Sequence, residues 1–378
     1  MQSKLYSSAP RLFDDNHFMC DLADISNRIG AINPRDYDKS RNYLQGSVSW
    51  LSPFTTHGIC NTQQIAHTLL QNHDARQCYR FLFELGWREF FHRTWQIHGD
   101  AIFDDLQRPQ SGACYEQLPK AVLHADTRIN IIDQCLRELY QSGLMHNHAR
   151  MWVAAIVCNL AQTHWLGAAR WFHYHLLDGD LASNSLSWQW IAGTFSHKRY
   201  VANQANIDKY SHSEQHGSWL DVSYETLNEA LNSKQIPERL IERGTVILDS
   251  ELPGVPVKPL KGPVALRSIW QLDPRWQSDK KQQVVFIDTR WHEQWPLSNR
   301  RWRFIGHWAK ACNATIYHGT PEQLLLNSQK AELIREEHPA CRDWPGKVIE
   351  RQWLYPMPEK PFTSFSQYFK QVKQHVGL

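Results

Sequence analysis

The stretch LLDGDLASNSLSWQW, from Leu176 to Trp190, carries the densest cluster of polar and aromatic side chains in the sequence. Its two aspartates, Asp178 and Asp180, flank Gly179. Burying two carboxylates this close together is costly unless each one finds a partner. The stretch therefore predicts a buried, charge-paired site or, as the plainer alternative, a loop that caps a helix and leaves both carboxylates in water.

A second polar stretch, MHNHARM from Met145 to Met151, offers a partner for these carboxylates. Arg150 can hold a carboxylate through two parallel hydrogen bonds. Asn147 lies three residues earlier, on the same face of a helix, so the two side chains could grip one ligand together.

Apolar residues at mixed three- and four-residue spacings predict amphipathic helices from about residue 63 to residue 99. Further helical blocks are expected at 129–140 and 147–166, with a glycine after each. Helix therefore dominates the first two thirds of the chain.

The pattern changes past residue 250, where ELPGVPVKPLKGP contains four prolines. Short apolar runs at 284–288 and 314–319 flank a helical pattern at 302–312, which is the order of a βαβ unit. We predict a helical domain in residues 1–250, then a proline-rich linker and a small α/β, Rossmann-like domain with a parallel sheet in residues 251–378. The sequence contains neither a GxGxxG fingerprint after a strand nor a GxxxxGK[ST] loop.

Composition narrows the classes of function. The net charge of +3 over 378 residues is too small to indicate nucleic-acid binding by itself. The amino terminus lacks a signal-peptide layout, no apolar run is long enough to span a membrane, and the eight cysteines form no CxxC pair. We therefore expect a cytoplasmic protein without a membrane contact. His173 and His175 do not share a helical face, so no metal site is expected.

Seventeen tryptophans are unusually many. A well-filled core explains them as readily as a role in stacking or electron transfer does. Their positions must decide between these interpretations.

Five stretches together resemble the flavin-binding helical domain of the DNA photolyase and cryptochrome family. These are ELGWREFF (residues 84–91), MHNHARM (145–151), LLDGDLASNSLSWQW (176–190), SWLSPFTTHG (49–58) and YDKSR (37–41). The resemblance covers about residues 33–190. It implies a non-covalent FAD, bent into a U shape and reduced in the active state.

The resemblance assigns cofactor-binding roles one residue at a time. The residues that match the family's FAD contacts are Tyr37, Ser49, Leu51, Ser52, Asn147, Arg150, Asp178, Asp180 and Asn184. Among them, Arg150 is expected to form an ion pair with Asp178, and Asn184 to face flavin N5. A neutral amide both donates and accepts hydrogen bonds, so Asn184 tolerates the protonation changes of a reduced flavin. Val48 stands where the family has a threonine in the phosphate loop.

Substrate binding is implied by a second set of matches. Glu84 and Trp87 match the motif that holds a flipped-out cyclobutane pyrimidine dimer, and Trp190 matches an aromatic that stacks on it. Met151 stands where relatives specific for the 6-4 lesion have histidine. Glu84, Asn184 and Trp190 are the expected catalytic residues, and Arg41 is expected to contact the DNA.

Electron supply is a third role. Trp188 and Trp165 match the inner members of the tryptophan chain that reduces photoexcited flavin. Gly112 stands at the outer position, and Tyr115 is the nearest aromatic, with Trp152 and Trp171 as alternatives.

The function that follows is light-driven splitting of cyclobutane dimers in UV-damaged DNA, single- or double-stranded, by reduced FAD. The alternative is a cryptochrome-like photoreceptor without repair activity. The resemblance leads us to expect a chain without an amino-terminal antenna domain, with an α/β module after the flavin domain instead. Whether that module holds an antenna chromophore stays open. After Trp190 the sequence departs from the family, and Lys198 and Arg199 are candidate replacements for a DNA-phosphate contact.

Overall fold

The computed structural model describes residues 18–280, 282–357 and 360–376. The start of the chain, whose layout differs from that of a signal peptide, lies outside the described residues up to residue 17. As predicted, the chain is mainly helical from residue 18 to residue 240. Its helices there are α1 Leu22–Gly30, α2 Pro34–Ser40, α3 Ser52–Thr56, α4 Thr62–Asn72, α5 Ala75–His98, α6 Lys120–Leu123, α7 Asn130–Ser142, α8 Asn147–Ala155, α9 Trp165–His175, α10 Leu181–Ala192, α11 Gln204–Ser211 and α12 Tyr224–Asn232.

Short irregular elements link these helices. They are the 3₁₀ turns η1 Gly99–Phe103 and η3 Glu238–Leu240, the π-helical turn η2 Ile156–Leu160, and the two-stranded antiparallel ribbon of β1 Leu118–Pro119 and β2 Arg243–Gly244. The helical block predicted at 147–166 breaks here. Gln162 adopts a left-handed backbone with φ 55°, and its carbonyl accepts a hydrogen bond from Cys114 N (2.8 Å), so the helix stops and α9 begins afresh at Trp165.

The second part of the chain forms the predicted parallel sheet. Its elements are β3 Val255–Pro256, β4 Lys261–Arg267, β5 Gln282–Asp288, α13 Thr289–Gln294, α14 Asn299–Ala311, β6 Thr315–Gly319, α15 Pro321–Asn327, β7 Lys330–Glu336, η4 Pro339–Cys341, β8 Lys347–Ile349 and α16 Phe365–Val376. The proline-rich stretch supplies the edge strand β3, where a proline that donates no hydrogen bond is tolerated, and the start of β4. Pro263 of β4 precedes Val264, the first residue of β4 that pairs with β5.

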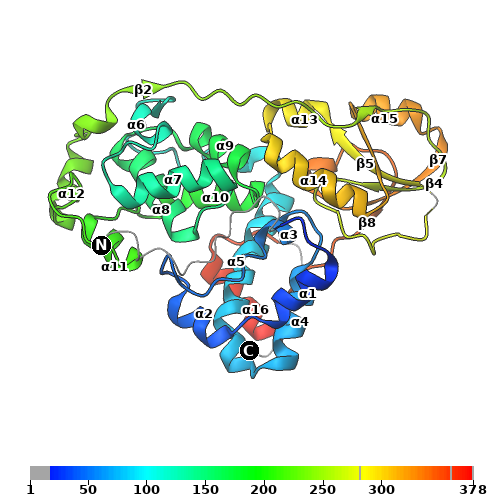
Figure 1. Cartoon of the computed structure of the whole chain (residues 1–378), viewed down its shortest axis with the longest axis horizontal. Helices are drawn as coiled ribbons and strands as arrows, with labels where there is room; N and C mark the ends of the chain where they lie inside the picture. Colours follow the sequence, from blue (N-terminus) through cyan, green and yellow to red (C-terminus); the bar gives the residue numbers. More distant parts are fainter. Residues whose placement is uncertain (1–17, 281, 358–359, 377–378) are drawn as a thin grey trace.

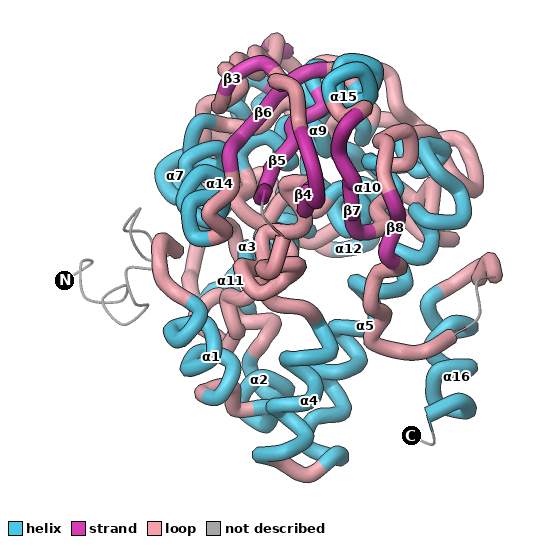
Figure 2. The backbone as a smooth tube through the Cα atoms, turned by 90° about the vertical axis from the view of Figure 1, so that its right-hand side faces the viewer, coloured by secondary structure: helices cyan, strands magenta, loops and turns pink. Residues whose placement is uncertain are grey.

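The strands lie in the order β3-β6-β5-β4-β7-β8 (Figure 2). Every recorded pairing in this sheet is parallel. Counted from β4, the chain first adds β5 and β6 on one side and then β7 and β8 on the other. This is the doubly wound order in which ligands bind at the crevice where the direction of winding changes. The fold class predicted from the sequence is confirmed.

Buried apolar side chains form two clusters that do not follow the order of the chain. One cluster joins the core of α1–α5 to the core of the sheet and to α16, and the other lies within α6–α12. Figure 1 shows α16, in red, back beside α5 at the base of the molecule. The division into residues 1–250 and 251–378 stays a prediction. The packing shows that the end of the chain returns to the helices of its beginning.

Candidate functional site at the junction of α5 and α10

The loop between α9 and α10 contains the Asp-Gly-Asp sequence and is held from several sides. Asp180 caps α10, and its Oδ1 accepts a hydrogen bond from Ser183 N (2.8 Å). A Cβ atom at Gly179 would lie 2.8 Å from both Arg301 Nη1 and His173 O, so only glycine fits there. The loop is therefore a packed, defined structure, and the alternative of a solvated capping loop is wrong: both aspartates are buried.

Asp178 forms the expected ion pair. Arg150 Nη2 donates to both carboxylate oxygens at 2.9 Å, and Ser52 Oγ donates to Oδ2 at 2.6 Å. Arg150 Nε also donates to Met145 O (2.9 Å), which fixes the guanidinium. The three predicted residues Ser52, Arg150 and Asp178 are thus brought together from α3, α8 and the loop before α10.

Asp180 has a different set of partners. His92 Nε2 lies 2.8 Å from its Oδ2, and Arg88 Nη2 lies 3.2 Å from the same oxygen, both from α5. Burial alone would raise the pKa of this carboxyl, but the charge of Arg88 and the hydrogen bonds from His92 and Ser183 outweigh burial and hold the pKa well below its usual range. Asp180 is a fixed carboxylate.

In the part of the chain that the structure describes, the other residues matched to FAD contacts are not joined to Asp178 or Asp180 by a recorded side-chain hydrogen bond. Tyr37 on α2 packs on Phe81, with ring centroids 4.6 Å apart. Ser49 Oγ accepts from Leu51 N at 3.5 Å, and Asn147 is exposed at the first turn of α8. Asn184 on α10 donates through Nδ2 to Ala169 O (2.8 Å).

Two serine hydroxyl groups near Asp180 could donate hydrogen bonds to the polar groups of a cofactor. The hydroxyl oxygens of Ser183 and Ser185, at the start of α10, are buried without a hydrogen-bond partner. A buried polar atom of this kind is rare unless a ligand or water completes it. The residues present therefore fit a cofactor with polar groups beside Asp180 and Asn184.

The residues matched to substrate binding lie on the next turns of α5 and α10. Glu84 accepts a hydrogen bond from Arg41 Nε (3.3 Å), and Arg41 also pairs with Asp38. Burial raises the pKa of the Glu84 carboxyl, and Arg41 counteracts part of this effect. Trp190 remains 36% exposed, which leaves its ring accessible to a guest.

Trp87 and Met151 complete this set. Trp87 is partly buried and stacks on Phe365 of α16, with centroids 3.8 Å apart and planes inclined by 16°. Met151 is partly buried against the cluster of α6–α12.

The two inner tryptophans are buried on adjacent helices. Trp188 packs edge-on against Phe172 (5.0 Å), and Trp165 donates through Nε1 to Asp105 (2.7 Å). Tyr115 O accepts from His164 N (2.7 Å), directly before Trp165, and the Tyr115 ring is 39% exposed. The backbone of Tyr115 thus contacts the residue before Trp165, and its ring reaches solvent.

A tryptophan at Gly112, the outer position, would be strained, because the backbone there is left-handed with φ 84°. An added Cβ would lie 3.4 Å from Arg199 Nη1, which is an ordinary contact. Arg199 also runs along Gly193, where a Cβ would meet its Cγ at 3.1 Å. Arg199 is therefore partly buried between two glycines, while Lys198 is exposed.

Sequence reasoning missed three residues that build the site. Arg301 on α14 is fully buried, donates to His173 O (2.7 Å) and to Gly179 O (3.0 Å), and has its pKa lowered to about 9 by burial. His92 could have been found, because it lies four residues after Arg88 on one helical face. Arg351, which donates to His92 Nδ1 (3.0 Å), carries no local signal because it lies 259 residues further along the chain.

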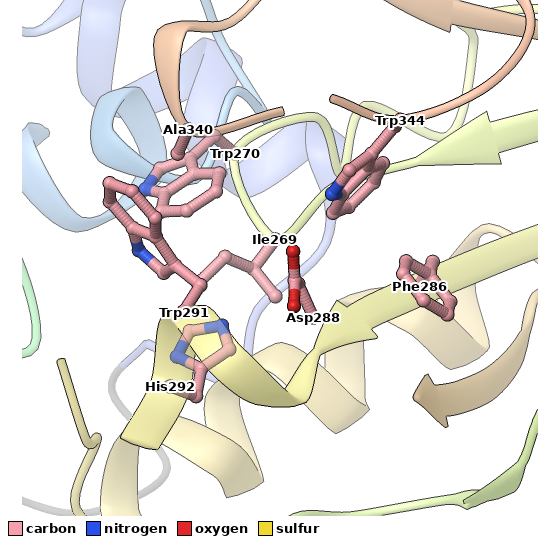
Figure 3. Close-up of a pocket in the computed structure, with 8 residues that line it drawn as sticks. All are labelled: Ile269, Trp270, Phe286, Asp288, Trp291, His292, Ala340 and Trp344. Carbon is pink, nitrogen blue, oxygen red and sulfur yellow. The ribbon is translucent and has the colours of Figure 1, made fainter. Parts of the chain in front are cut away.

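The crevice of the sheet is filled from within the chain. Only a narrow pocket without room for a water molecule remains there (Figure 3). It is lined by Ile269 and Trp270 after β4, Trp291 and His292 on α13, and Ala340 and Trp344 after β7. Trp270 stacks on His338 at 4.2 Å, and Trp291 packs on Trp95 of α5 at 6.1 Å. The indole rings of Trp270, Trp291 and Trp344 therefore fill the crevice in which a doubly wound sheet binds its ligand, and Trp291 also contacts α5.

Among the described residues, no helix has the length and apolar character needed to cross a bilayer. The same part of the chain shows no group of three His, Cys, Asp or Glu side chains arranged to hold a metal ion.

Residues 81–222 match the family described as the FAD binding domain of DNA photolyase. The resemblance to photolyases and cryptochromes is therefore confirmed. The match includes α5 and α10, which carry the junction described above, and it supports FAD as the cofactor.

The chain is similar to proteins named as photolyases and to proteins named as cryptochromes. Deoxyribodipyrimidine photo-lyase of Streptomyces griseus is 32% identical over 164 residues, which are 42% of this chain and 35% of the relative. Cryptochrome DASH of Natronomonas pharaonis is 27% identical over 202 residues, which are 49% of this chain and 42% of the relative. The chain thus spans about a third of the first and less than half of the second. These relatives do not decide between repair and light sensing.

Two solved structures align with 58% of this chain. A cryptochrome from Synechocystis sp. PCC6803 aligns over 52% of its own length with a TM-score of 0.47 and 21% identity. A bacterial class III photolyase from Agrobacterium tumefaciens aligns over 55% of its length with a TM-score of 0.44 and 20% identity.

Proposed function

We propose that the protein is an FAD-dependent, blue-light-driven lyase that splits cyclobutane pyrimidine dimers in UV-damaged DNA. The observation that supports this proposal is that two groups of side chains lie along one pair of helices. Arg88 and His92 on α5, with Asp180 just before α10, would serve a cofactor. Glu84 and Trp87 on α5, with Trp190 on α10, would serve a guest.

The cofactor would be held chiefly by charge and amide groups. Arg150, Asp178 and Ser52 form one fixed cluster, while Asp180 presents a carboxylate whose charge is neutralised by Arg88. Asn184 uses its amide nitrogen on Ala169 O, which leaves its carbonyl oxygen to accept from the cofactor. Bound in the reduced state, FAD would supply an electron on absorbing blue light and recover it once the two carbon bonds of the dimer have split.

The guest would be held by the chain's own side chains. Trp190 offers a partly exposed indole, on which a base stacks without regard to its sequence. Because burial raises the pKa of Glu84, this carboxyl holds a proton more readily than an exposed one, and it can share that proton with a dimer carbonyl oxygen that gains negative charge.

A photoreceptor function is the second candidate. It is favoured by Phe365, which already covers one face of Trp87, and by the position of Arg199, which is packed between Gly112 and Gly193. A photoreceptor needs neither an uncovered aromatic ring that stacks on a DNA lesion nor an arginine that is free to contact DNA.

The test is a repair assay on oligonucleotides with one cyclobutane dimer or one 6-4 lesion, in light and in darkness, with chemically reduced protein. The proposal expects light-dependent loss of the cyclobutane dimer alone. Unchanged dimer with FAD bound and reduced would favour the photoreceptor.

A further inference from the structure

Arg351 connects the carboxy-terminal module to the cofactor junction. It follows β8, and its guanidinium reaches α5, where Nη2 lies 3.0 Å from His92 Nδ1. The other ring nitrogen of His92, Nε2, lies 2.8 Å from Asp180 Oδ2. His92 therefore stands between a cation from one end of the chain and the carboxylate that caps α10.

This geometry fixes the protonation state of His92. A guanidinium only donates hydrogen bonds, so Nδ1 must accept from Arg351 and cannot carry a proton. The ring proton is then on Nε2, which donates to Asp180. A second proton on Nδ1 would face the donor of Arg351, so His92 is held as the neutral Nε2–H tautomer.

The surrounding charges act in the same direction. Burial, followed by the charges of Arg88 and Arg351, lowers the pKa of His92 to about 4, although Asp180 opposes the shift. The charged and titratable groups that face this cluster are Arg88 from α5, Asp180 from the start of α10, Glu336 at the end of β7, and Glu337 and His338 directly after it. His338 is itself neutral, because burial holds its pKa well below the usual range.

Arg351 is held in place by its own neighbours. The Trp353 ring lies between two guanidinium groups, with Arg93 at 4.3 Å and Arg351 at 4.4 Å from its centroid. Glu89, buried on α5, accepts from the backbone nitrogens of Leu354 and Tyr355. These contacts clamp the segment after β8 onto α5.

We propose that Arg351 is a positioning residue of the flavin site: it holds His92 as the neutral Nε2–H tautomer, and His92 in turn orients the carboxylate of Asp180. The link to the flavin rests on the proposed function, namely on Asp180 facing the cofactor. The link from Arg351 to Asp180 does not.

The first experiment follows the imidazole nitrogens of the full chain, labelled with ¹⁵N-histidine, by NMR during a pH titration. His92 is assigned by the signal lost in His92→Gln. Arg351→Met should let Nδ1 become protonated and raise the pKa of His92 by about one unit or more, which is a tenfold or larger change in proton affinity. Arg351→Gln keeps a neutral donor and should preserve the Nε2–H tautomer.

The matched control is Arg342→Met, which removes an arginine of the same module that pairs with Asp100 at the surface. It should leave the His92 signals unchanged. Parent-like His92 signals in Arg351→Met would overturn the proposal, and so would equal changes in Arg342→Met.

The second experiment measures the midpoint potential of the bound FAD at pH 7 in the same variants. Arg351→Met should shift it, Arg351→Gln should shift it less, and Arg342→Met should leave it at the parent value. Altered His92 signals in a chain that binds no FAD would leave the positioning role standing and refute the proposed function. Bound FAD with parent potentials throughout would refute the coupling of Arg351 to the flavin.

Discussion

Phe365 and Trp87 lie face to face, with ring centroids 3.8 Å apart and ring planes inclined by 16°. Phe365 opens α16, so the last helix of the chain supports a residue of α5. Phe365 is buried and also packs edge-on against Phe83 (4.9 Å). The stack fixes the plane of the Trp87 ring and covers one of its two faces.

Replacing Phe365 with alanine should weaken binding of dimer-containing DNA. An aromatic pair of this kind is worth about 0.5–1.5 kcal/mol beyond its buried area, so we expect a loss of about two- to tenfold in affinity. The measurement is DNA binding by fluorescence anisotropy in darkness. Val372→Ala is the control, because Val372 is buried on the same helix about two turns after Phe365. Equal losses in both variants would show that α16 acts only through stability.

Glu84→Ala should lower the yield of dimer splitting without slowing light-driven reduction of FAD. The reason is the raised pKa of this partly buried carboxyl, which lets it share a proton with the dimer. Removing a general acid of this kind costs roughly 10²–10⁴-fold in rate. The yield is measured per absorbed photon with chemically reduced protein. A parent-like yield would remove Glu84 from the catalytic set.

Trp188→Phe should have the reverse effect. Phenylalanine is much harder to oxidise than tryptophan, so light-driven reduction of oxidised FAD should slow, while repair by chemically reduced protein should continue. The reduction is followed by loss of flavin absorbance under blue light. Trp308→Phe is the control, because Trp308 is equally buried but belongs to α14 of the sheet module. If both variants reduce FAD at the parent rate, Trp188 is not the electron donor.

Stability should fall as the pH drops from about 6.5 to about 4. Burial lowers the pKa of His92 to about 4, and an unfolded histidine titrates near 6.5, so the unfolded chain binds the extra proton in this window. His92 alone should contribute a loss on the order of 3 kcal/mol across the window, with no further loss from this residue below it. Above pH 6.5 its contribution is fully present.

Urea unfolding at a series of pH values measures this effect. His92→Gln should make the dependence of the unfolding free energy on pH between 6.5 and 4 less steep by the share of His92. The other buried histidines, whose pKa values burial also lowers, should keep the rest of the slope. His67→Gln, a change at an exposed position of α4, should keep the parent slope. An unchanged slope in His92→Gln would show that His92 is not buried as a neutral imidazole.

The sequence predicted the helix that carries Arg150, because its apolar spacing is a local signal. The ion pair of Arg150 with Asp178, whose partners lie 28 residues apart, was indicated by charge and by the resemblance to the photolyase and cryptochrome family. The stack on Trp87, the Arg351 contact and the support of Gly179 by Arg301 could not be predicted, because their partners come from the far end of the chain and only the tertiary fold brings them together. No local periodicity encodes such contacts.

The same limit applies to the sheet. The runs at 284–288 and 314–319 indicated β5 and β6 correctly. Strand β7, with its charged side chains, and edge strand β3, with its prolines, showed no clear alternation. Their pairing with β4 and β6 defines them as strands.

The most direct test of the account is the count of cyclobutane dimers in a defined oligonucleotide after blue light, with the FAD-loaded protein reduced chemically beforehand. The account predicts that dimers disappear in light, persist in darkness, and persist in light when Glu84 is alanine. Dimers that persist in light with the parent protein, its flavin bound and reduced, would contradict it.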